Sequence, residues 1–332
     1  MQSVYDWQGL VYLEFCDLLN LYSTDGMLPP GGIMSERIIR YNQKSSREFG
    51  WDPSWFGCKD FDYTLIKKIK EFQKEKSLLV DGMLGPLSFR RIEAERLSEM
   101  RFQEPKKRQR RSDQYIVCNG KRIPIKWRKV VRWDEPNGLS CVPGSYVDMS
   151  KRADRKPNFF VNHWDATLSS SACARIIKKR KLSIHFCIDN DGTIYQLLDT
   201  QDIAYQAGKR LWNHKSIGVE ISNAFYRKYQ NWYKKNGFGE RPIMRGEFVH
   251  GRQIETHLGF YDVQLEALAA LWEAISVGCD IPLEVPEGKK EVKEDCSKAE
   301  FDGFINHYHL TRRKIDCASL DMEKVLEKAK SL

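Results

Sequence analysis

The sequence of 332 residues predicts a small all-α domain followed by an α/β domain, in which a mixed sheet is flanked by helices. In residues 61–99, apolar side chains recur at intervals of three and four residues, as they do on packed helices. From residue 159 onward, short apolar runs typical of strands alternate with segments of helical periodicity. This alternation is typical of a sheet covered by helices.

Residues 1–100 are assigned to the helical domain, and residues 63–76 within it predict an amphipathic helix. The apolar side chains on one face of this helix are Leu65, Ile66, Ile69 and Phe72. A turn at residues 81–86 precedes Ser88, which can cap a second helix. Residues 25–30 (DGMLPP) resemble residues 81–86 (DGMLGP), either because the chain contains two degenerate copies of one module or by chance.

Residues 101–113 are polar and strongly basic, so we interpret them as a linker, with a polyanion-binding stripe as the alternative. Residues 114–150 contain short strand-like runs between turn signals and predict a hairpin-like connection into the second domain. The net charge of +9 would attract polyanions such as nucleic acid, anionic lipid or an anionic cell wall. A nucleic-acid interface needs basic or aromatic residues ordered on one face, so a mere charge run predicts no nucleic-acid partner.

Three features bear on where the protein works. No apolar run approaches the roughly 20 residues of a membrane-spanning helix, so no membrane insertion is expected. The first seven residues lack the basic start and apolar core of a secretion signal. The nine cysteines are odd in number and form no CxxC pairs, which fits a reducing compartment. The sequence therefore predicts synthesis in a cytosol and an exit that depends on another factor.

The second domain, residues 151–332, contains several strand and helix candidates. The strand candidates are residues 159–163, 185–189, 192–197 and 216–221. A strong hairpin signal, Asn190-Asp191-Gly192, joins the middle two. Helices fit residues 170–180 and 262–278, and the second of these has a continuous apolar face.

Separated pieces of this domain carry side chains that can bind a metal or transfer a proton. His163 closes one strand candidate, and Glu220 lies inside another that is otherwise apolar. Near the C-terminus come His307 and His309, followed by Lys314-Ile315-Asp316-Cys317. Two histidines and an acidic group would supply three zinc ligands and leave one position for water, as in catalytic zinc sites. The alternative interpretation is a packed histidine together with a structural ion pair between Glu220 and Lys314.

Four motifs follow one another in an order found in a known family. They are residues 160–167 (FVNHWDAT), 182–196 (LSIHFCIDNDGTIYQ), 204–208 (AYQAG) and 213–220 (NHKSIGVE). Over residues 158–330 the chain resembles the type-2 N-acetylmuramoyl-L-alanine amidases, which include phage endolysins, bacterial muropeptide amidases and animal peptidoglycan recognition proteins. The resemblance implies hydrolysis of the amide bond between N-acetylmuramic acid and L-alanine in bacterial peptidoglycan, with Zn²⁺ as the cofactor.

Carried over position by position, the resemblance implies that His163, His307 and Asp316 bind the zinc ion. Glu220 and Lys314 match the catalytic pair of the family. Zinc would activate a water molecule, Glu220 would pass its proton to the departing alanine nitrogen, and Lys314 would stabilise the tetrahedral oxyanion.

Two of the implied ligands have rivals. The family usually has Asp-Pro-Gly or Cys-Pro after the lysine, whereas here Asp316 is followed by Cys317, and some short phage amidases use a cysteine ligand there. Spacing from Lys314 favours Asp316, and Cys317 is the alternative. His309 competes with His307, which the family's distance from the lysine favours.

On the substrate side, the resemblance points to Gln206, Asn213 and His185. Gln206 stands where the family commonly has histidine, which would alter substrate contacts without removing a ligand. His185 matches a structural or substrate-facing position. The short phage enzymes carry a tyrosine immediately before this histidine, whereas this chain has Ile184, so the acid–base role would fall on Glu220.

The helical domain also resembles a known module. Residues 66–73 (IKKIKEFQ) and 79–86 (LVDGMLGP) look like the three-helix peptidoglycan-binding domain. In such domains these positions are largely architectural, supplying a core aromatic and a tight turn. A wall-binding module would raise the local concentration of an attached amidase on its polymeric substrate.

These expectations describe a modular phage endolysin that acts on bacterial peptidoglycan. It would wait as a monomer in the cytoplasm of the infected bacterium and reach the wall after a holin-type pore opens. The alternative is a non-catalytic peptidoglycan recognition protein. Such relatives lose zinc ligands, whereas this sequence keeps a full set.

Overall fold

The computed structural model describes residues 30–99, 114–150, 152 and 155–332. The chain forms two compact units, residues 1–93 and 94–332. The predicted linker and residues 25–29 of the segment that resembles residues 81–86 lie outside the described residues. None of the described helices combines the length and the apolar character needed to cross a bilayer.

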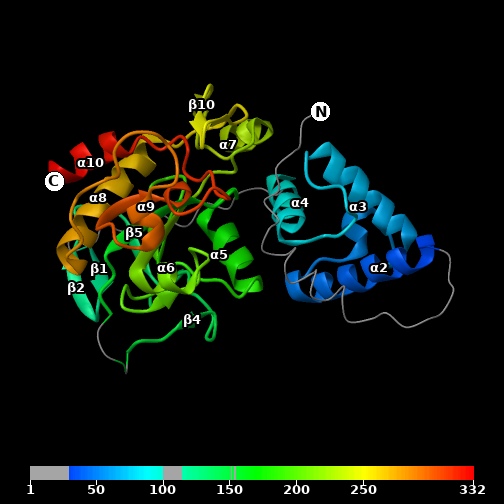
Figure 1. The fold of residues 1–332 in the computed structure, drawn as a ribbon, viewed down its shortest axis with the longest axis horizontal. Helices are drawn as coiled ribbons and strands as arrows, with labels where there is room; N and C mark the ends of the chain where they lie inside the picture. The colour runs from blue at the N-terminus through cyan, green and yellow to red at the C-terminus, as the bar shows by residue number, and fades with distance from the viewer. Residues whose placement is uncertain (1–29, 100–113, 151, 153–154) are drawn as a thin grey trace. The chain divides into compact units, whose positions relative to one another are not determined.

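The N-terminal part is helical, as predicted. It contains α2 (Pro30–Phe49), the 3-10 helix η1 (Pro53–Phe56), α3 (Tyr63–Glu75) and α4 (Pro86–Glu99). The three α-helices are labelled in Figure 1. The carboxylate of Asp62 caps α3 by accepting a hydrogen bond from the backbone N–H of Leu65. Leu65, Ile66 and Ile69 are buried along the predicted apolar face.

The second predicted helix begins earlier than expected. Pro86 occupies the first position of α4, where a missing N–H costs nothing and the fixed φ angle suits a helix. Ser88 therefore lies inside α4 rather than at its cap. Its buried hydroxyl accepts a hydrogen bond from Gln73 Nε2 at 3.2 Å.

Two buried side-chain amides hold the turn that precedes α4. The oxygen of Gln73 accepts from the backbone N–H of Gly82 at 2.8 Å, and its Nε2 donates to the carbonyl of Met83 at 3.0 Å. From the other side, Asn42 donates to the carbonyl of Gly82 at 2.9 Å and accepts from the N–H of Leu84 at 2.8 Å. Gly82 has φ +80°, which explains the glycine at this position.

The second unit is built on a six-stranded mixed sheet with the strand order β14–β5–β9–β6–β7–β3. The four strands from β14 to β6 are parallel, β7 is antiparallel to β6, and β3 is parallel to β7. The strands are β3 (Val130–Arg132), β5 (Phe159–Trp164), β6 (Phe186–Ile188), β7 (Ile194–Gln196), β9 (Ser216–Ile221) and β14 (Gly303–Asn306). All six residues of β5 are buried, as expected for a parallel strand covered on both faces.

Helices cover both faces of this sheet. In Figure 1, α8 (Asp262–Cys279) and α10 (Met322–Lys330) lie on one side and α5 (Ser170–Lys179) on the other. Trp272 of α8 is fully buried and stacks on Phe304 of β14, with 4.6 Å between the ring centroids. Its indole N–H donates to Asn162 Oδ1 at 3.2 Å, so α8 is fixed against the middle of β5.

Shorter elements complete the second unit. They are β1 (Tyr115–Cys118), β2 (Lys121–Pro124), β4 (Tyr146–Val147), β8 (Ile203–Ala204), α6 (Arg210–Lys215), η2 (Arg227–Tyr229), α7 (Gln230–Lys235), β10 (Ile243–Met244), β11 (Phe248–Val249), β12 (Arg252–Gln253), β13 (His257–Leu258), α9 (Glu294–Lys298) and η3 (His307–His309). In the predicted connecting segment, β1 and β2 form an antiparallel hairpin. The same segment also supplies β3 to the main sheet, so it does more than connect two domains.

The turn around Gly82 offers a test of the N-terminal architecture. We expect Gln73→Leu to lower the free energy of unfolding of this unit by about 2 kcal/mol, because the buried N–H of Gly82 loses its acceptor. Urea unfolding of the full chain, with hydrogen exchange at the Gly82 amide, measures the effect. The matched control is Lys74→Leu at the exposed neighbouring position, expected within about 0.5 kcal/mol of the parent chain. Unchanged protection of Gly82 in Gln73→Leu would contradict this role.

Candidate metal centre and active site

The alternation of side chains along the strands brings His163 and Glu220 to one face of the sheet. On β5, Phe160 and Trp164 point into the core beneath α8, so His163 points to the opposite face. Glu220 is the direct partner of His163 in the parallel pairing of β5 with β9. His307 follows the last residue of β14, and the carboxyl ends of parallel strands β14, β5 and β9 share one edge. Ligand sites in open α/β sheets form at this edge.

Asp316 joins the two histidines across a buried space. Its Oδ2 lies 3.0 Å from His163 Nδ1 and 3.2 Å from His307 Nδ1. The centroids of the two imidazole rings are 4.5 Å apart, and the rings are nearly perpendicular. One ligand-type atom from each of the three side chains lies within 4.8 Å of the other two. Side chains from distant stretches of the chain thus lie together in one buried group.

The charges of this group favour a cation. Burial acts to lower the pKa of His163, but the hydrogen bond with Asp316 and the charge of Glu220 outweigh it and raise that pKa. Burial acts to raise the pKa of Asp316, but the imidazoles of His307 and His163 hold it well below its ordinary value. Both shifts mark a buried place where positive charge is stabilised.

The same atoms fit a zinc ion. Burial lowers the pKa of His307 to about 4, so this imidazole is neutral and can act as a ligand near pH 7. Ligand atoms 2.0–2.1 Å from a tetrahedral zinc lie about 3.3 Å from one another. The Nδ1–Oδ2 distances of 3.0 and 3.2 Å are close to that separation. Asp316 Oδ1 is buried and has no hydrogen-bond partner among the described residues.

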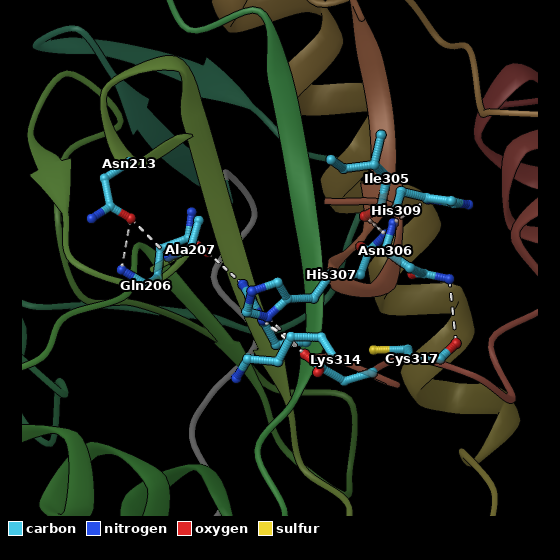
Figure 2. Close-up of polar contacts among 12 residues, drawn as sticks. Gln206, Ala207, Asn213, Ile305, Asn306, His307, His309, Lys314 and Cys317 are labelled. Carbon is cyan, nitrogen blue, oxygen red and sulfur yellow. Dashed lines mark hydrogen bonds and ion pairs between the residues drawn. The ribbon is translucent and has the colours of Figure 1, made fainter. Parts of the chain in front are cut away.

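Glu220 and Lys314 lie at the margin of the group. Glu220 is half-buried, and its negative charge raises the pKa of His163, its partner on the neighbouring strand. The positive charge of Lys314 lowers the pKa of both His307 and Asp316. Figure 2 shows the side chains of Lys314 and His307 in the same part of the site. The backbone carbonyl of Lys314 accepts a hydrogen bond from His250 Nε2 at 2.9 Å, which fixes its loop.

Residues 153–316 match the sequence model of a protein family described as N-acetylmuramoyl-L-alanine amidase. This segment of the chain belongs to that family. The matched segment of the amidase domain contains all three converging side chains together with Glu220 and Lys314.

Several solved structures are similar to part of this chain. They include the catalytic domain of XlyA, the endolysin LysCS from Clostridium intestinale and the hydrolase AmiA from Staphylococcus aureus in complex with its ligand. The XlyA domain is 16% identical with a TM-score of 0.36, and the match covers 60% of this chain and 99% of that domain. For LysCS the identity is 15%, the TM-score 0.34 and the coverage 61% of this chain and 95% of LysCS. For AmiA the identity is 12%, the TM-score 0.37 and the coverage 62% of this chain and 84% of AmiA. No curated protein matches the chain. The family assignment therefore rests on the sequence match together with the geometry of the site.

The rival ligands lie elsewhere in the amidase domain. Cys317 is fully buried in the apolar core beneath α8, and burial raises the pKa of its thiol well above the ordinary value. Its carbonyl accepts a hydrogen bond from Asn306, marked in Figure 2. Burial lowers the pKa of His309 to about 3, and its Nδ1 accepts from the backbone N–H of Asn306 at 3.1 Å. Among the described residues, the converging group contains Asp316 and His307 and neither rival.

Of the three residues predicted to face substrate, only Gln206 is in direct hydrogen-bond contact with His163 among the described residues. Gln206 contacts His163 Nε2 through its side-chain oxygen. Asn213 Oδ1 accepts from the backbone N–H groups of Gln206 and Ala207 at 3.2 and 2.7 Å, as the dashed lines in Figure 2 show. His185 is buried, donates from Nε2 to the carbonyl of Asp202 at 3.0 Å, and has its pKa lowered to about 3 by burial. Their contact with substrate stays a prediction.

One supporting residue carries no sequence signal. Arg155 is buried, and its guanidinium donates to the carbonyls of Thr200, Asn213, His214 and Ser216. The carbonyls of Asn213, His214 and Ser216 lie at the end of α6 and the start of β9, so Arg155 fixes this helix against the strand that carries Glu220. An isolated arginine before a strand candidate gives no hint of carbonyl partners up to 61 residues away.

The choice between neighbouring ligands can be tested by metal analysis. We expect Asp316→Ala to lose at least about tenfold in zinc affinity, because it removes the atom shared by both imidazoles. The control Cys317→Ala should retain zinc with the affinity of the unchanged chain, since this thiol faces the core. Competition with a chromophoric chelator measures both affinities. Loss of zinc in Cys317→Ala with retention in Asp316→Ala would reverse the assignment.

Proposed function

We propose that the chain is a zinc-dependent amidase that hydrolyses the bond between N-acetylmuramic acid and L-alanine in bacterial peptidoglycan. The observation that carries the proposal is the convergence of His163, His307 and Asp316 beside Glu220 and Lys314, inside a segment that belongs to the amidase family. A catalytic zinc site requires three protein ligands and an open position, and three such side chains meet here.

The residues around the group divide the chemistry. Zinc held by the two imidazoles and Asp316 would supply Lewis acidity to the scissile carbonyl and to a water molecule. The carboxylate of Glu220 takes the proton of the attacking water as the new carbon–oxygen bond forms. Glu220 then gives this proton to the alanine nitrogen as the carbon–nitrogen bond breaks. The ammonium of Lys314 donates to the oxygen that becomes negative during the attack.

We further propose that the protein acts as a phage endolysin. The net charge of +9 suits a polyanionic bacterial wall, and the N-terminal unit resembles a peptidoglycan-binding module that would hold the enzyme on its substrate. In this proposal a monomer accumulates in the cytoplasm of the infected bacterium and reaches the wall through a holin-type pore. The same unit in a bacterial lytic enzyme would serve the same tethering purpose.

The role of Glu220 is open to a direct test. We expect Glu220→Gln to lower the rate of wall hydrolysis by about 10²–10⁴-fold, because the amide cannot accept the proton of water. The assay follows new amino groups released from purified walls, with reducing sugars measured in parallel to exclude glycosidase activity. The matched control is Glu240→Gln at an exposed ion pair with Lys234, which should keep full activity. A Glu220→Gln variant with undiminished amine release would refute the assigned role.

Treatment with a chelator distinguishes a zinc-dependent amidase from a non-catalytic binding protein. Removing divalent metal should abolish amine release while leaving attachment of the full chain to insoluble walls, and added zinc should restore the activity. Amine release that persists after complete zinc removal would contradict the proposed function.

A further inference from the structure

The second ring nitrogen of His163 has a partner of its own. Nδ1 of His163 faces Asp316, whereas Nε2 contacts the side-chain oxygen of Gln206. A neutral imidazole carries one proton, so a ring that presents a lone pair at Nδ1 must carry its proton at Nε2. The partner of Nε2 therefore decides whether Nδ1 can serve as a ligand, and a carboxamide oxygen selects the correct tautomer.

The orientation of the Gln206 carboxamide is fixed from its other end. Its Nε2 donates to Ser216 Oγ at 2.7 Å, which directs the oxygen toward His163. The backbone of Gln206 is held as well, because Asn213 Oδ1 accepts from its N–H at 3.2 Å and from that of Ala207 at 2.7 Å. Side chain and backbone are thus constrained separately.

The neighbouring strand leaves space for this carboxamide at one position. A Cβ atom added to Gly218 would lie 2.7 Å from Gln206 Oε1 and 2.8 Å from its Cδ, closer than van der Waals contact allows. Gly218 lies on β9 between Ser216 and Glu220, and its N–H donates to His185 Nδ1 at 3.2 Å. Glycine at this buried strand position permits Gln206 to reach His163.

We propose that Gln206 is a positioning residue of the amidase site, which holds the Nε2 proton of His163 and so turns the Nδ1 lone pair toward the metal. The proposal rests on the zinc-dependent function proposed above and extends it by one residue. It gives Gln206 a role that acts through His163, in place of the substrate contact expected from the sequence. Ser216 and Gly218 contribute to the site indirectly, because Ser216 orients the Gln206 carboxamide and Gly218 leaves room for it.

The test compares two substitutions of similar length in the full chain. Gln206→Met removes the acceptor, and we expect zinc affinity to fall about 10–100-fold, as for other lost partners of metal-bound histidines. Gln206→Glu keeps an acceptor oxygen in place and should retain the zinc affinity of the unchanged protein, since Ser216 Oγ can donate to the carboxylate. Chelator competition with zinc alone measures affinity without reference to activity.

A spectroscopic measurement reports on the tautomer itself. In zinc-loaded protein with ¹⁵N-labelled histidine, His163 should show a slowly exchanging proton on Nε2 and none on Nδ1. In Gln206→Met this Nε2 proton should exchange rapidly, and in Gln206→Glu its protection should return. A substitution that only lowers the stability of the fold, without a change at His163, would leave the exchange rate of the Nε2 proton unchanged.

Gly218→Ala provides a second route to the same answer should Gln206→Met fail to fold. It leaves Gln206 chemically intact but places a methyl group where its carboxamide lies, so zinc affinity should fall in the same direction. Full zinc affinity in folded Gln206→Met or Gly218→Ala would overturn the positioning role. A raised KM in Gln206→Met with unchanged kcat and zinc affinity would also overturn the positioning role, because it indicates that Gln206 contacts substrate. Either result would leave the proposed amidase function intact. Failure of the unchanged chain to bind zinc would refute both the proposed function and the positioning role of Gln206.

Discussion

The buried carboxylate of Asp316, shared between two imidazoles, is the interaction on which the rest of the site depends. A carboxylate removed from water is unstable unless opposite charge and hydrogen bonds compensate it. Here the compensation comes from His163, which lies 153 residues away in sequence, and from His307. The charges of Asp316 and Glu220 raise the pKa of His163 despite its burial, and a divalent ion bound by these side chains would compensate the buried carboxylate in the same way.

The fold meets this requirement by dividing the two faces of the sheet. One face of β5, β9 and β14 packs beneath α8 and carries apolar side chains, with Trp272 fixed against β5. The opposite face places His163 and Glu220 side by side where these strands end. Gln206 contacts His163, Gly218 leaves room for the Gln206 carboxamide, and the buried Arg155 holds the start of β9. Hydrogen bonds to the sheet thus restrict the orientation of the side chains in the site.

Much of this arrangement could be predicted because it follows from local pattern and motif order. The mixed sheet follows from alternating strand and helix patterns. His163 lies in one of the four ordered motifs, whereas His307 and Asp316 follow only from the family resemblance that those motifs carry. Asp316 and Cys317 could not be separated by spacing alone, because adjacent residues differ only in the direction that the tertiary fold gives them. The contact of Gln206 with His163 spans 43 residues and depends on a glycine that leaves room on a neighbouring strand. No periodicity reports such a contact.

The central claim is that two imidazoles and one carboxylate hold a zinc ion that keeps an open coordination position. X-ray absorption at the zinc edge of the zinc-loaded full chain tests it most directly. We expect only nitrogen and oxygen neighbours at about 2.0–2.2 Å, with the outer-shell scattering of two imidazole rings. A sulfur neighbour at about 2.3 Å, or a spectrum without imidazole scattering, would contradict it.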